Sequence, residues 1–205
     1  MSPIIKTFAV VAFSAAVASL AACDQKSKPT PENFKVAVQV ALDRRPAVCA
    51  RSPAETFPFD EPKGSGWGLD DYKRAQALAS AGLLKSTETK VPLRVNKSVT
   101  ADGAHFVLTD EGKKYLIPAE AAIVTPQFCG GKLRLRDLTS ATAPVGEGVG
   151  AQVLVTYGYD VVNAPAWTHN AAMQEMFAND LHAVSQTTNT QSRLELTRDG
   201  WSVPN

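Results

Sequence analysis

The strand pattern of residues 151–162, AQVLVTYGYDVV, decides the second half of the fold. Every second residue over most of its length is apolar: Val153, Val155, Tyr157, Tyr159 and Val161. Apolar residues that recur at every second position lie on one face of a β-strand. The segment therefore predicts a long strand with one apolar face, which ends at the break Asn163-Ala164-Pro165.

Shorter elements surround this strand. Leucines alternate with arginines over residues 132–138, and residues 193–198 predict a last strand. The glycine- and proline-containing segment 139–149, TSATAPVGEGV, predicts a loop. Asn170 can cap a helix in which Met173, Met176, Phe177 and Leu181 share a face. Residues 119–205 are therefore predicted to form an antiparallel β-rich module with one helix.

The first half begins with a helix signal at Thr30-Pro31-Glu32, a cap followed by proline and an acid. The following residues also alternate with period two, which leaves a strand as the alternative. Periodicity predicts a helix from Asp70 to about residue 84 and strands at 87–95 and 105–109. Pro92 predicts an edge position and Asp102-Gly103 a turn. Residues 31–118 are thus predicted as a small α+β module, and the whole chain as α+β.

This order of elements has a counterpart in a known family. The helix ends in Gly82-Leu83-Leu84, two strands follow, and Leu108-Thr109-x-x-Gly112 opens a short helix. Residues 69–117 in this way resemble the second half of a winged-helix domain, which implies a helix–strand–strand unit that also serves protein contacts. The helices that precede this unit in the family are replaced here by a proline- and glycine-rich stretch. The frame Leu-Thr-x-x-Gly recurs at residues 196–200, as a duplicated unit or as two similar strand ends.

The N-terminus has the pattern of an export signal. Lys6 is followed by an uncharged, mostly apolar run at residues 8–20, which is shorter than the roughly 20 residues of a bilayer span. Leu20-Ala21-Ala22-Cys23 resembles the lipobox of bacterial lipoproteins. The alternative interpretations are an ordinary cleaved signal with an incidental cysteine, or an uncleaved anchor.

The lipoprotein resemblance implies where the protein resides. Residues 1–22 would be removed, and Cys23 would carry acyl chains that hold the protein on a membrane of the bacterial envelope, facing the periplasm. In enteric lipoproteins an aspartate at the position of Asp24 marks the inner membrane, which we favour over the outer membrane. The polar residues 23–30 are predicted as a lipidated cysteine and a short tether.

Charge excludes some partners. The 205 residues carry a net charge of +1, and Lys6 is the only charged residue before Cys23. The mature chain is therefore formally neutral. A neutral chain, with Asp70 and Asp71 beside the only bases of its predicted helix, is not expected to bind nucleic acid.

The remaining cysteines and histidines give no catalytic or metal-binding motif. Cys49 and Cys129 are the only cysteines left after lipidation, and an oxidising envelope favours a disulfide between them. A reactive thiol beside Gly130-Gly131 is the alternative. No known nucleophile, phosphate-loop or zinc spacing is present. We therefore expect no metal, no cofactor and no enzyme activity.

The aromatic residues offer one candidate ligand surface. Tyr157, Tyr159, Trp167 and Trp201 either line a platform for a glycan or peptide, or belong to the core. From the export signal, the wing-like unit and the missing catalytic set, the sequence predicts a lipid-anchored envelope protein that contacts another, unidentified envelope protein. The alternative function is binding of a small ligand or a cell-wall fragment through the aromatic strand face.

Overall fold

The structure, a computed structural model, describes residues 25–64, 69–119 and 125–204. It confirms an α+β fold with helices and antiparallel sheets. The lipobox with Cys23, and Asp24, lie outside the described residues. In chain order the elements are α2 (Pro31–Asp43), β1 (Val48–Arg51), β2 (Phe59–Pro62), α3 (Leu69–Ser80), β3 (Leu84–Pro92), β4 (Thr100–Leu108), α4 (Asp110–Tyr115), β5 (Leu116–Ile117), β6 (Gln127–Gly130), β7 (Lys132–Ala141), β8 (Gln152–Val162), η2 (Ala166–His169), α5 (Ala171–Met176), α6 (Ala178–Ser185), β9 (Thr188–Thr197) and β10 (Gly200–Ser202).

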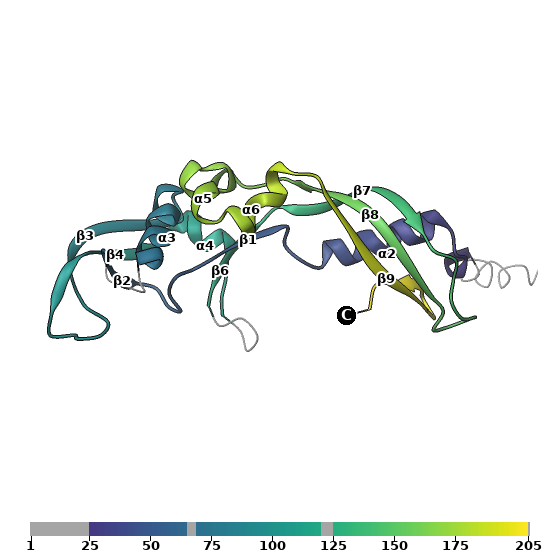
Figure 1. Cartoon of the computed structure of the whole chain (residues 1–205), viewed down its shortest axis with the longest axis horizontal. Coiled ribbons are helices and arrows are strands. Elements are labelled where there is room, and N and C mark those ends of the chain that lie inside the picture. Colours follow the sequence, from purple (N-terminus) through teal and green to yellow (C-terminus); the bar gives the residue numbers. More distant parts are fainter. Residues whose placement is uncertain (1–24, 65–68, 120–124, 205) are drawn as a thin grey trace, which may run out of the picture.

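The elements form an elongated molecule with one core at each end (Figure 1). At one end, α2 lies across a four-stranded sheet of order β10-β9-β8-β7. At the other end, α3, α5 and α6 pack with the three-stranded sheet β2-β4-β3 and the small sheet β1-β6-β5. The long strand predicted at residues 151–162 is β8, and Val161 near its end contacts both cores.

Helix α2 begins as the sequence predicts. The Thr30 side chain accepts a hydrogen bond from the Asn33 amide, and Pro31 occupies the first turn. Phe34, Ala37, Val38 and Leu42 form its buried face. The helical periodicity wins over the period-two alternation because a sheet is available to cover that face, which leaves Val36 and Val40 exposed.

The two cores do not follow the predicted boundary at residues 118 and 119. Helix α2 comes from the first predicted module but packs on the sheet of the second. In return, Met173, Phe177 and Leu181 come from the second module and pack in the core of α3 and β4. Apolar periodicity identifies the face that a helix buries, whereas the sheet that covers it is fixed only by tertiary contacts.

The turn predicted at Asp102-Gly103 is wrong, because both residues lie inside β4. They pair with Lys90 and Thr89 of β3, and the connecting loop spans residues 93–99. Glycine at position 103 instead allows the backbone of β2 to lie close to β4. A β-carbon at this position would clash with the backbone of Glu61 and Pro62. Pro92 does lie on an edge strand, since β3 is at the end of its sheet.

The outer edge of β7 is covered by a side chain of α2. The Gln39 amide oxygen accepts from the Leu135 N–H at 2.8 Å, and its amide nitrogen donates to the Leu133 carbonyl at 3.1 Å. The two bonds reproduce the pairing that a neighbouring strand would offer. An edge occupied in this way is less able to pair with another chain.

Candidate functional site

The four aromatic residues do not form an exposed platform. Tyr157, Trp167 and Trp201 are 3%, 4% and 8% exposed, and Tyr159 is half-buried. Trp167 belongs to the core around α3, whereas the other three pack at or against the core beneath α2. The structure thus corrects the expected ligand surface in favour of the core alternative. The alternation of β8 identified an apolar face but not the helix that covers it.

The disulfide between Cys49 and Cys129 is confirmed. The two residues lie directly opposite each other in the antiparallel pair of β1 and β6, with Cα atoms 4.1 Å apart. Their side chains therefore leave the sheet on the same face. The bond ties β1, which follows α2, to β6, which precedes β7.

The histidines lie apart from one another. The His105 ring contacts the Asp60 carboxylate at 2.6 Å, and the His182 ring contacts the Asn179 carbonyl at the same distance. His169 is exposed at the end of η2. Within the described ranges, no three His, Cys, Asp or Glu side chains are close enough to hold a metal ion.

The segment before α2 is fastened to the body of the protein. The Trp201 indole N–H donates to the carbonyls of Ser27 and Lys28, each at 3.1 Å. The Asn33 side-chain amide donates to the carbonyls of Gln25 and Lys28 at 2.7 and 2.9 Å. Residues 25–28 of the expected tether are therefore packed on the sheet instead of lying free.

Two loops, one at each end of the molecule, each present two exposed valines. The β3–β4 loop presents Val95 and Val99, which are 96% and 46% exposed. The β7–β8 loop at the opposite end presents Val145 and Val149, which are 74% and 66% exposed. Figure 1 shows these loops at the far left and the lower right of the molecule. Exposed apolar side chains at loop tips are candidates for contact with another surface.

A buried acid holds the β3–β4 loop in place. The Glu61 side chain in β2 is only 1% exposed and accepts a hydrogen bond from Arg94 at 2.6 Å, while its second carboxylate oxygen has no partner among the described residues. Arg94 also approaches Asp71 at 3.5 Å. Burial raises the pKa of Glu61; the charge of Asp71 adds to this, and Arg94 opposes it. Nothing in the sequence around Glu61 indicates that this acid is buried.

Glu61 should make stability depend on pH. The pKa of the folded carboxyl lies above its ordinary value of about 4.5, so the folded chain holds this proton more tightly than the unfolded chain. The contribution of Glu61 is therefore most favourable at low pH and falls as pH rises through 4.5 to the raised pKa. As the pH rises through this range, the Glu61→Gln variant should become more stable relative to the native protein. Urea unfolding of both chains from about pH 4 to about pH 8 measures the change.

Asp71→Asn is the matched control for this series. It removes the neighbouring negative charge, so the pKa of Glu61 should fall and the pH window should move down. A constant difference between Glu61→Gln and the native protein at every pH would contradict the assignment.

A cavity of about 570 Å³ lies beside the disulfide, between β1, β6, α3 and α6. Arg51 and Arg74 line it together with Gln127 and Asp180. Neither guanidinium group forms a hydrogen bond or an ion pair with another residue that the structure describes. The Arg74 guanidinium lies 5.8 Å from the centre of the Phe177 ring, and its Nε atom is buried. Two unpaired guanidinium groups beside one carboxylate give the cavity an anion-binding character.

Comparison with known proteins gives no family. No protein-family model, curated protein or solved structure matches this chain. Among the described helices, none combines the length and apolar composition that a bilayer span requires.

Proposed function

We propose that the protein is a lipoprotein of the bacterial envelope, anchored through acyl chains on Cys23, which holds another envelope protein without catalysing a reaction. The lipobox supports the anchor and a position facing the periplasm, and Asp24 favours the inner membrane over the outer one. The observation that carries the contact role is Val95, whose side chain is 96% exposed at the end of the molecule opposite residues 25–28.

The β3–β4 loop is ordered by its own contacts before any partner binds. The Leu93 amide donates to the Val99 carbonyl at 2.8 Å, and the Val99 amide donates to the Asn96 carbonyl at 3.0 Å. Arg94 is tied to the buried Glu61. A loop that is already ordered loses little conformational freedom on binding, which favours association.

The wing-like interpretation of residues 69–117 belongs to the same proposal. Strands β3 and β4 pair over nine positions, from Leu84↔Leu108 to Pro92↔Thr100. The Thr109 hydroxyl accepts from the Gly112 amide at 2.9 Å and so caps α4. These contacts support a winged-helix-like unit whose β3–β4 loop is the wing. Since fold alone does not transfer function, the exposed loop carries the contact role.

The charges around the loop indicate what kind of partner it fits. Arg94 and Lys97 lie in the loop itself, and Lys90 on β3 is paired with Asp102. Arg94 is compensated by Glu61 and Asp71 and Lys90 by Asp102, which leaves Lys97 as the one loop cation without an ion pair among the described residues. An apolar tip with one such cation is complementary to an apolar pocket with an acid at its border. We therefore propose a protein partner with such a pocket, and no nucleic acid.

A photo-crosslinking amino acid at position 95 should test this contact in living cells. We expect one discrete adduct, which Val99→Asp should weaken about tenfold because it places a charge at the contact. The same crosslinker at position 147, in the opposite loop, is the matched control. No adduct above that control, or an adduct that Val99→Asp leaves unchanged, would remove the basis of the contact role.

The cavity beside the disulfide favours a second candidate function, the binding of a small anionic ligand such as a carboxylate-bearing cell-wall fragment. Arg51 and Arg74 would supply the donors. We expect muropeptides to raise the melting temperature of the protein, and Arg74→Gln to abolish the shift. Arg193→Gln, at an exposed position of β9, should keep the shift. An equal shift in both variants would exclude this site.

A further inference from the structure

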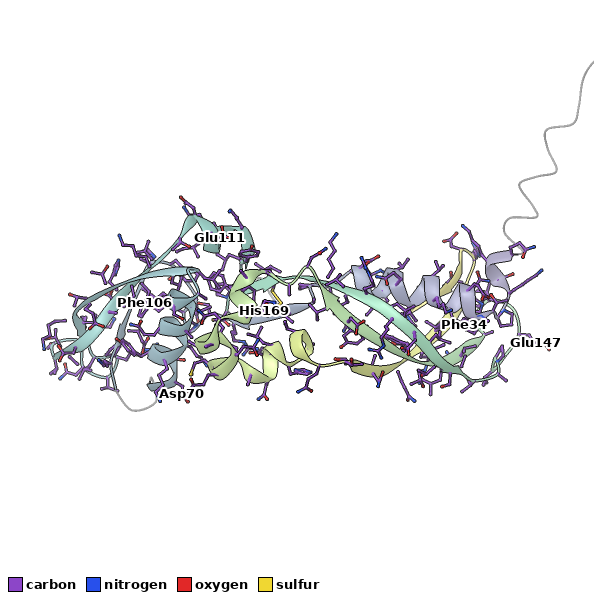
Figure 2. The ribbon with its side chains drawn as sticks, turned by 90° about the horizontal axis from the view of Figure 1, so that it is seen from above. Phe34, Asp70, Phe106, Glu111, Glu147 and His169 are labelled. Carbon is purple, nitrogen blue, oxygen red and sulfur yellow. A yellow bond between two sulfur atoms is a disulfide. The ribbon has the colours of Figure 1, made fainter. Side chains whose placement is uncertain are left out.

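The segment that leads to Cys23 and the β7–β8 loop lie at the same end of the molecule. A β-carbon placed on Gly200 would lie 3.2 Å from Lys26, so the segment rests on β10. Strand β10 pairs with β9 through Trp201↔Leu196, and the Leu196 carbonyl accepts from the Gly150 amide at 2.8 Å. Figure 2 shows Glu147, in this loop, beyond Phe34 at that end.

The β7–β8 loop has the composition of a surface that touches an apolar or interfacial layer. All residues from 142 to 150 are exposed, and Glu147 is their only charged member. Reciprocal backbone hydrogen bonds of 2.8 and 2.9 Å between Val145 and Gln152 hold the loop base. Val145 and Val149 are therefore presented outward on a constrained loop.

We propose that this loop lies in the headgroup layer of the bilayer and holds the molecule upright, with the β3–β4 loop pointing away. The inference rests on the acyl anchor proposed above. Cys23 and Gln25 are two residues apart, a reach of at most about 7 Å. Because residues 25–28 are bonded to Trp201 and Asn33, the anchor would pull this end against the membrane.

The charges of this end favour the lipid surface as the occupant. Lys26 and Lys28 lie in the fastened segment, and cations near the bilayer are attracted to anionic headgroups. Glu147 is compatible with the headgroup layer but not with the hydrocarbon core, where a carboxylate is costly. The acyl chains supply the affinity, and the loop supplies the orientation.

The test uses the full lipidated chain in vesicles of phosphatidylethanolamine and phosphatidylglycerol. With Cys23 acylated and Cys49 bonded to Cys129, Glu147→Cys provides a single thiol for an environment-sensitive fluorophore. Lys97→Cys, in the opposite loop, is the matched control. We expect blue-shifted emission and quenching by nitroxide-labelled lipids at position 147 but not at position 97. Adding Val145→Asn and Val149→Asn should reduce the quenching at least twofold.

This experiment tests the orientation of the β7–β8 loop and the acyl anchor on Cys23 separately. A protein that floats with the vesicles but shows a fully aqueous label at position 147 would overturn the orientation and leave the anchor intact. A blue shift without lipid quenching would assign the loop to a protein neighbour and also overturn it. A chain that does not float at all would refute the acyl anchor itself.

Discussion

We expect the double variant Cys49→Ser with Cys129→Ser to lose about 4.5 kcal/mol of unfolding free energy. The two cysteines are 80 residues apart, so the bond removes much of the freedom of the unfolded chain. It also fixes β1, which follows α2, to β6, which precedes β7. Urea unfolding of the native and variant chains measures the loss.

Reductant provides the control for this comparison. Dithiothreitol should lower the midpoint of the native protein toward that of the double variant and leave the variant unchanged. Equal unfolding free energies with and without reductant would contradict a stabilising bond.

The second large effect is expected at Trp201. Trp201→Ala empties a site that packs edge-on against Phe34, with ring centres 5.2 Å apart, and truncations of buried tryptophans cost about 3–5 kcal/mol. Trp201→Phe keeps most of the ring and loses the indole bond to Ser27 and Lys28, at a cost of about 1 kcal/mol. Trypsin cleavage after Lys26 should become faster in both variants because residues 25–28 are released.

Trp167→Phe is the matched control for the indole bond. Trp167 is also buried, but no described residue accepts a hydrogen bond from its indole nitrogen. The change should leave cleavage after Lys26 at the native rate. Slow cleavage in Trp201→Phe would show that another contact holds the segment.

Local elements of this fold could be predicted from the sequence because their determinants are local. The cap at Thr30 marks the start of α2 and the alternation in residues 151–162 marks β8, but the choice of helix over strand for α2 depends on the sheet that covers it. Similar short motifs need not have similar structures. In residues 108–112 the threonine caps α4, whereas in residues 196–200 the Thr197 hydroxyl donates to the Gly200 carbonyl in the turn between β9 and β10. The duplicated-unit interpretation thus has no structural counterpart.

The contacts that build the candidate sites could not be predicted, because they join distant segments. Nothing near Glu61 in the sequence indicates that Arg94 reaches it from the β3–β4 loop. The cavity takes Arg51 from β1 and Arg74 from α3. Only the cysteine pair was predictable over such a distance, because two thiols in an oxidising compartment usually form a disulfide.

The packing of α2 on the C-terminal sheet also has a consequence for synthesis. Gln39 and Leu133 are 94 residues apart, which at roughly 5–20 residues per second is about 5–20 s of translation. During that interval the apolar face of α2 has no sheet to cover it, and an isolated helix of this length is marginal in water. Helix α2 therefore stays uncovered until β7 has been made, and the ring contact between Phe34 and Trp201 forms only after β10 has followed.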